Sequence, residues 1–144
     1  MSIKQISVFL ENKPGTLLAM TNVLAQNDID MRALNVAETK DFGIARLIVD
    51  DVYEATTVLK DAGYIHSLTP VLGVSIPDEP GGLSRVLGVL EDAQINVEYL
   101  YAFLGGKDAS KAYMIFRVQD HKAAASALAA KGIQVVDQDE MAQL

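Results

Sequence analysis

The spacing between apolar residues changes several times along the chain. Residues 3–10 alternate between the two kinds, which predicts a β-strand. Residues 17–24 carry apolar side chains three or four positions apart, which predicts one face of a helix. Residues 29–36 and 42–49 return to strand-like patterns. A switch of phase near Arg32 predicts a β-bulge in the first of these two strands.

A second helix and a fourth strand complete the first half of the chain. Asp50 and Asp51 stand before residues 52–62, whose apolar positions again have helical spacing, and aspartates at such a position predict an N-cap. Gly63 predicts the end of this helix. Residues 64–68 predict the fourth strand. The predicted order is therefore β-α-β-β-α-β.

The second half of the chain repeats this order. Strand-like residues 72–76 precede helix-like residues 83–90, and further strands begin near Ile95 and Tyr113. An alanine-rich helix and a short last strand follow. The tail, residues 137–144, is polar, and we expect it to fray.

The repeat predicts the fold class and the domain organisation. The β-α-β-β-α-β order with right-handed crossovers is that of a ferredoxin-like unit, an antiparallel sheet with its helices on one face. We therefore expect an α+β fold with two such units, residues 1–69 and 70–144. Because a unit of this size is marginally stable alone, we expect the two to pack together.

A Pro-Gly turn joins the first strand of each predicted unit to its first helix. Proline fixes φ near a turn value, and glycine permits a backbone conformation that other residues avoid. The helix that begins there directs unpaired N–H groups and the positive end of its dipole outward, which suits a carboxylate or a phosphate. A plain turn without a ligand is an equally weighted alternative. The two turns are Asn12-Lys13-Pro14-Gly15-Thr16-Leu17 and Asp78-Glu79-Pro80-Gly81-Gly82-Leu83.

Composition excludes several classes of function. The 144 residues carry a formal charge of −7, which argues against nucleic acid and against anionic membrane surfaces. The chain has no cysteine, so it can form neither a disulfide framework nor a thiolate metal site. We expect no cofactor and no metal. Neither a signal peptide nor an apolar run of membrane-spanning length is visible, so a cytoplasmic location is expected.

Catalytic chemistry has no visible basis in the sequence. The two histidines, His66 and His121, fall on a predicted last strand and at a predicted helix start. No nucleophile with a matching base, and no paired acid and base, accompanies them. We therefore expect that the protein is not an enzyme.

The two turns, together with the strand that follows each first helix, resemble the ACT domain. The turn has the form Asn/Asp-x-Pro-Gly-x-Leu, and Ile29-Asp30-Met31 is matched by Ile95-Asn96-Val97. The resemblance covers nearly the whole chain, once in each half, and is that of a stand-alone tandem ACT protein. It implies a non-catalytic, allosteric regulatory protein that binds a free amino acid. For a stand-alone module three roles stay open: a sensor, a trans-acting regulatory subunit of a separate metabolic enzyme, and a purely structural dimerisation unit. It also implies that the ligand lies between two ACT units, near the first loop of one and the second strand of the other.

The resemblance and the chemistry of an amino acid together suggest the ligand-binding residues. The ligand carboxylate suits the N–H groups after each Pro-Gly turn, and its ammonium group suits the side-chain oxygen of Asn12 or Asp78. Carbonyl groups near Met31 or Val97 offer further acceptors. The predicted residues are Asn12, Lys13, Pro14, Gly15, Thr16, Leu17, Met31, Asp78, Pro80, Gly81, Gly82, Leu83, Val97, Tyr99 and Tyr101.

The two predicted sites differ. The first turn is nearly neutral, whereas Asp78 and Glu79 make the second turn acidic, and we expect that charge to repel a carboxylate. Tyr99 and Tyr101 would face the first turn if the pairing of the family holds, and would favour a large apolar, aromatic or imidazole side chain. Plain core packing is the alternative for both tyrosines.

Apolar residues on the second face of each sheet predict an assembly. The alternation places Phe9, Ile44, Ile48, Tyr113 and Ile115 on the face away from the helices. Exposed apolar area of this kind marks a partner surface, and we expect a homodimer. Strands covered on both faces are the alternative. A protein-interaction or dimerisation module without a ligand is the alternative function.

Overall fold

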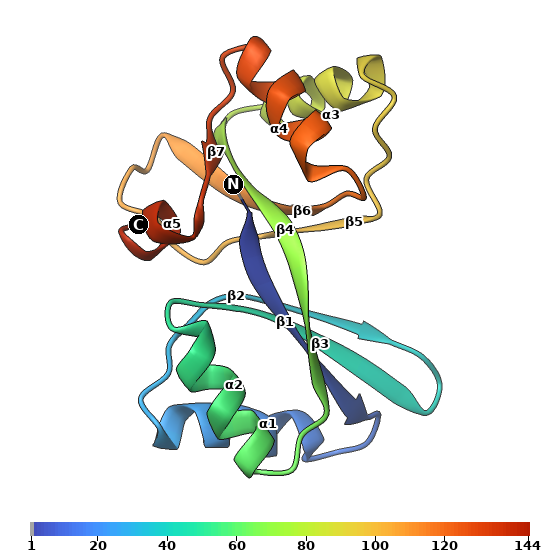
Figure 1. The fold of residues 1–144 in the computed structure, drawn as a ribbon, viewed down its shortest axis with the longest axis vertical. Helices are drawn as coiled ribbons and strands as arrows, with labels where there is room; N and C mark the ends of the chain where they lie inside the picture. Colours follow the sequence, from blue (N-terminus) through green and yellow to red (C-terminus); the bar gives the residue numbers. More distant parts are fainter. Residues whose placement is uncertain (1) are drawn as a thin grey trace. The chain divides into compact units, whose positions relative to one another are not determined.

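The computed structural model describes residues 2–144, and these fold into two compact units. The N-terminal unit is Lys4–Thr69, and the C-terminal unit is Pro70–Leu144 together with residues 2 and 3. Both have the predicted β-α-β-β-α-β order (Figure 1). The predicted α+β fold of two ferredoxin-like units is confirmed.

The N-terminal unit orders its strands β2-β3-β1-β4 and is antiparallel where β1 and β2 pair with β3. Helices α1 and α2 pack on one face of this sheet, and the core lies between them and alternate residues of the strands. The register shifts between Met31 and Ala33, which confirms the predicted bulge. The elements are β1 (Ile3–Glu11), α1 (Thr16–Gln26), β2 (Met31–Glu38), β3 (Phe42–Val49), α2 (Val52–Asp61) and the first part of β4 (His66–Pro77).

The C-terminal unit orders its strands β7-β4-β6-β5, with antiparallel pairing throughout. Its core lies between the sheet and the helices α3 and α4. Strand β7 is only two residues long and pairs with β4 at Gly73 and Val74. The elements are the rest of β4, α3 (Gly82–Asp92), β5 (Tyr99–Ala102), β6 (Lys111–Arg117), α4 (His121–Ala130), β7 (Val135–Val136) and α5 (Gln138–Ala142).

The helices of each unit begin in two different ways. The N-caps of α1 and α3 are Gly15 and Gly81, both in the left-handed conformation and both without a side-chain cap. The N-caps of α2 and α4 are Asp51 and Asp120, whose carboxylates accept a hydrogen bond from a backbone N–H in the first turn. An aspartate cap of this kind satisfies one of the four N–H groups that a helix start leaves unpaired. The glycine-capped starts lack this internal acceptor.

Two features of the chain differ from expectation. The tail does not fray, because Asp137 caps the short helix α5 and Met141 is 1% exposed. A single buried methionine in a polar stretch gives no periodic signal, so the sequence pattern missed it. The predicted strands 64–68 and 72–76 are also not separate, since β4 continues from His66 to Pro77 as one strand.

The sheet face opposite the helices is partly covered. In the N-terminal unit Phe9 is 49% exposed, whereas Ile48 on the same face is fully buried. In the C-terminal unit Ile115 is buried on the corresponding face. Both interpretations of this face are therefore right in part: some positions are open and others are covered.

Candidate functional site

The first Pro-Gly turn is held against the β2–β3 hairpin by Asn12. Its side-chain Nδ2 donates to the carbonyl of Thr39 at 3.0 Å, and its backbone N–H donates to the carbonyl of Asp41 at 2.9 Å. Because the amide nitrogen is engaged, the side-chain oxygen of Asn12 is the group that can accept a hydrogen bond from a ligand. This arrangement fits the predicted role as an ammonium acceptor.

Thr16 and Gly15 shape the start of α1. The Thr16 hydroxyl lies 2.7 Å from the carbonyl oxygen of Glu11 and 3.0 Å from that of Lys13, so it stabilises the turn. Gly15 has φ +89°, a left-handed value that side chains other than glycine's adopt at a cost. The N–H groups of Leu17 and Leu18 precede the first helical hydrogen bond, which Ala19 donates to the carbonyl of Gly15 at 3.0 Å, so they have no acceptor within the helix. Together with the helix dipole they favour an anion at this position.

The second turn copies this backbone but differs in its charges. Gly81 has φ +85°, and a Cβ added at Gly82 would lie 2.3 Å from the carbonyl oxygen of Pro77. Glu79 forms an ion pair with Arg85 on α3. The sequence prediction counted Glu79 as an uncompensated charge because its partner lies on the next element. The acidic character of this turn is therefore smaller than expected.

The second-strand residues do not lie beside the turn of their own unit. Met31 and Val97 pack against the helix-side cores. Met31 pairs with Val49, at the end of β3 remote from Phe42, which pairs with Glu11 beside the first turn. Within one unit, the predicted turn and strand positions are thus separated by the length of the sheet.

Tyr99 and Tyr101 lie on the sheet face away from α3 and α4. Their ring centroids are 6.4 Å apart with planes inclined by 20°, so the rings stack. Leu100 between them contributes to the helix-side core, which fixes the tyrosines on the opposite face. Tyr101 is buried. The first turn belongs to the other unit, so its predicted pairing with these tyrosines stays a prediction.

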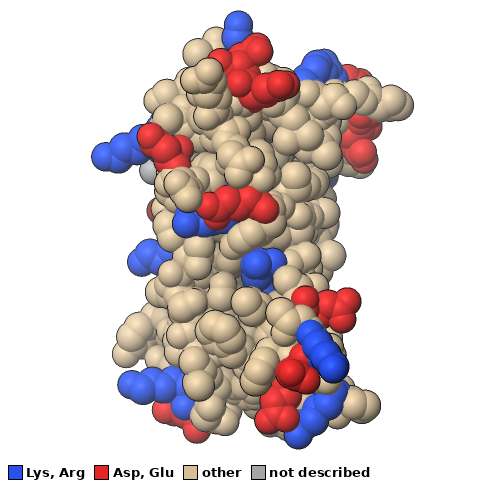
Figure 2. Space-filling view, turned by 90° about the vertical axis from the view of Figure 1, so that its right-hand side faces the viewer, with Lys and Arg blue, Asp and Glu red and all other residues tan. Residues whose placement is uncertain are grey.

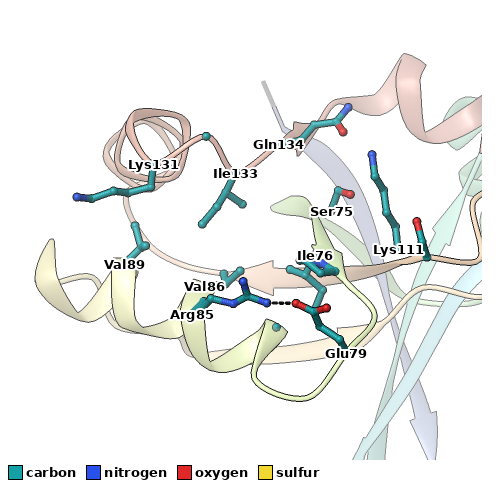
Figure 3. Close-up of a pocket in the computed structure, with 14 residues that line it drawn as sticks. Ser75, Ile76, Glu79, Arg85, Val86, Val89, Lys111, Lys131, Ile133 and Gln134 are labelled. Atoms are coloured by element: carbon teal, nitrogen blue, oxygen red, sulfur yellow. Dashed lines mark hydrogen bonds and ion pairs between the residues drawn. The ribbon is translucent and has the colours of Figure 1, made fainter.

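A cavity of about 830 Å³ opens within the C-terminal unit beside the second turn (Figure 3). It lies where β7 has not yet begun: β7 starts only at Val135, and beyond Ser75, whose N–H bonds to the carbonyl of Gln134, the edge of β4 has no β7 partner. The sequence reasoning missed it, since it depends on the length of a strand distant in sequence. Its lining comes from the β4 edge, the start of α3, the start of β6 and the α4–β7 segment, with Gly82, Arg85, Val86, Val89, Lys111 and Ile133 among the residues.

The whole of residues 1–144 matches the family model for an ACT domain pair. The chain belongs to the ACT domain pair family. No curated protein matches it.

Solved structures show the same fold as this ACT domain pair. The crystal structure of the Bacteroides thetaiotaomicron protein BT0572 is 36% identical, with a TM-score of 0.91 over 100% of this chain and 98% of that one. The regulatory subunit of aspartate kinase from Thermus thermophilus is 17% identical, with a TM-score of 0.67 over 90% of this chain and 93% of that one. The corresponding subunit from Thermus flavus is 16% identical, with a TM-score of 0.63 over 90% and 92%.

The pKa values of His121, Arg32 and Asp108 are shifted, and these residues lie outside the two Pro-Gly turns. Burial lowers the pKa of His121, and the neighbouring Arg117 lowers it further. The hydrogen bond to Asp50 raises the pKa of Arg32, and hydrogen bonds from Ser110 lower the pKa of Asp108. Burial at His121, an ion pair at Arg32 and a turn at Asp108 account for these shifts.

Residues 2–144 of the ACT pair contain no cluster of three or more side chains suited to a metal ion. No helix in this part of the chain is long and apolar enough to cross a membrane. On the face drawn in Figure 2, basic and acidic side chains are interspersed. That face presents no continuous field of one sign.

Proposed function

We propose that this ACT pair, with ACT domains at residues 1–69 and 70–144, is a non-catalytic allosteric regulator that binds a free amino acid and acts on a separate metabolic enzyme. One observation carries the proposal: a left-handed glycine, with no side-chain cap, opens a helix N-terminus in each unit. Such an end offers N–H donors to a carboxylate. The family and its regulatory-subunit neighbours support the same class of function.

The first turn is the proposed site for an amino acid with an aromatic or imidazole side chain. Its carboxylate approaches the start of α1, and its ammonium group donates to the side-chain oxygen of Asn12. Tyr99 and Tyr101 of a neighbouring ACT unit form the proposed wall for the side chain. Lys13 pairs with Glu11 at 2.8 Å, so the turn presents little net charge against the zwitterion.

A thermal-shift screen of the twenty amino acids tests the proposal. A ligand present at a hundred times its Kd should stabilise the folded protein by about 2.7 kcal/mol, which raises the melting temperature measurably. If no amino acid at millimolar concentration shifts it, the regulator proposal fails. The interaction module without a ligand then becomes the better account.

We further expect the ACT pair to be a homodimer. Phe9 and Phe42 are 49% and 58% exposed on one sheet face of the N-terminal unit, and apolar area of this kind is costly to leave in water. Sedimentation equilibrium at micromolar concentration should give about twice the chain mass of 15.5 kDa. A mass equal to that of one chain would contradict the expectation. Phe9→Ser and Phe42→Ser should each shift the equilibrium toward monomer, and Tyr53→Ser, at an exposed helix position, serves as the control.

A further inference from the structure

The cavity of the C-terminal unit has an apolar wall and a charged rim. Val86 and Val89 on α3 face Ile133 of the α4–β7 segment, and the Arg85–Glu79 ion pair lies beside them (Figure 3). The ammonium end of Lys131 points away from these residues in the same view. The opening therefore offers the Arg85–Glu79 pair and an aliphatic surface within a single unit, and Lys111 also contributes to its lining.

The ion pair is available to a ligand because it is exposed. The Arg85 and Glu79 side chains are 61% and 56% exposed, and exposed pairs contribute little to stability. A zwitterion can replace this ion pair with two charge-assisted hydrogen bonds. The Arg85 guanidinium donates one to the ligand carboxylate, and the ligand ammonium group donates the other to the Glu79 carboxylate. Exchange of partners leaves neither protein charge unpaired.

The N-terminal unit provides an internal comparison. When the two Pro-Gly turns are aligned, Lys13 stands where Glu79 stands, and Ala19 stands where Arg85 stands. The N-terminal unit thus keeps the turn and the helix but lacks both charges of the rim. The paired charges are a property of the C-terminal unit, and the shared ferredoxin-like fold does not require them.

We infer that this cavity is a second amino-acid site, selective for a zwitterion with an aliphatic side chain. The ligand carboxylate binds Arg85, its ammonium group binds Glu79, and its side chain packs on Val86, Val89 and Ile133. The inference rests on the proposed function in its class of ligand. It differs in placing this ligand inside one unit, on the fourth-strand side of the turn, with no contribution from a neighbouring unit.

Calorimetric titration with L-leucine tests the site. The parent protein should bind L-leucine at millimolar concentration or below, and L-serine, which lacks the aliphatic chain, should bind at least tenfold more weakly. Two analogues separate the charges. 4-Methylpentanoate lacks the ammonium group and 3-methylbutylamine lacks the carboxylate. Each should lose about tenfold or more in affinity, as expected for one charge-assisted hydrogen bond.

Matched variants locate the site. Arg85→Gln and Glu79→Gln should each weaken L-leucine binding about tenfold or more, while thermal unfolding confirms that both variants fold. Glu91→Gln, on the same helix but outside the cavity lining, should leave the affinity unchanged.

The outcomes separate this inference from the proposed function. No heat with L-leucine, or an affinity unaffected by Arg85→Gln and Glu79→Gln, overturns the cavity site. The regulator proposal survives that result if another amino acid shifts the melting temperature. Loss of L-leucine binding in Gly15→Val but not in Arg85→Gln would assign the ligand to the first turn and overturn the cavity site as well.

Discussion

Replacing Gly82 with alanine is expected to destabilise the protein by about 2–3 kcal/mol. The added Cβ would lie 2.3 Å from the carbonyl oxygen of Pro77, a distance at which the backbone itself must move. Gly82 is the first residue of α3, so relief requires either the helix start or the end of β4 to shift. Chemical denaturation followed by circular dichroism measures the loss.

Gly88 on the same helix is the matched control. A Cβ added there meets no atom within 4 Å, and glycine in a helix interior is less stable than alanine by about 0.5–1 kcal/mol. Gly88→Ala should therefore stabilise the protein while Gly82→Ala destabilises it. Equal stability of Gly82→Ala and the parent would show that the turn relaxes freely, and would contradict the close approach of Gly82 to Pro77.

The fold could be predicted from the sequence because most of its determinants are local. Alternation gave the strands, helical spacing gave α1 to α4, and the phase switch near Arg32 gave the bulge that the register shows between Met31 and Ala33. Gly15 and Gly81 marked the two helix starts, and both have the left-handed backbone that makes glycine necessary there. Repetition of the strand, helix and Pro-Gly turn signals in both halves strengthened the prediction.

The features that sequence reasoning missed depend on contacts between distant residues. Helix α5 is anchored by one buried methionine, Met141. A single apolar position forms no repeating pattern, so the sequence could not predict this helix. The cavity lies beside the part of β4 that β7 does not reach, because β7 begins only at Val135, and no pattern within β4 or α3 encodes where that strand begins. Glu79 in the turn pairs with Arg85 on the helix that follows. Counting only the charges within the turn therefore overestimated the acidity of the turn.

The sequence indicated which residues could form the candidate site but not how they are arranged in space. Asn12, Gly15 and Thr16 shape the first turn through hydrogen bonds and backbone conformation. Met31, chosen as a second-strand partner, packs in the core at the far end of the same sheet. A turn and a strand of one unit cannot form the predicted site together, so the proposal requires two units.

Gly15→Val should weaken binding of the aromatic or imidazole amino acid that gives the largest thermal shift at least tenfold, whereas Gly81→Val should retain it. The two positions form a matched pair, because their φ values are +89° and +85° and an added Cβ meets no atom within 4 Å at either. Valine in this conformation costs about 1–3 kcal/mol of stability. Since both variants carry this stability cost, a difference between their ligand affinities shows which turn binds the ligand.

The expected asymmetry has a steric origin. The valine at position 15 extends into the open space beside the start of α1, where the ligand carboxylate is proposed to meet the first-turn N–H groups. Calorimetric titration of both variants, each with native circular dichroism, should show at least a tenfold loss of affinity for Gly15→Val alone. If Gly81→Val loses the ligand and Gly15→Val keeps it, the aromatic or imidazole ligand belongs to the second turn, and the charge of Asp78 does not repel it.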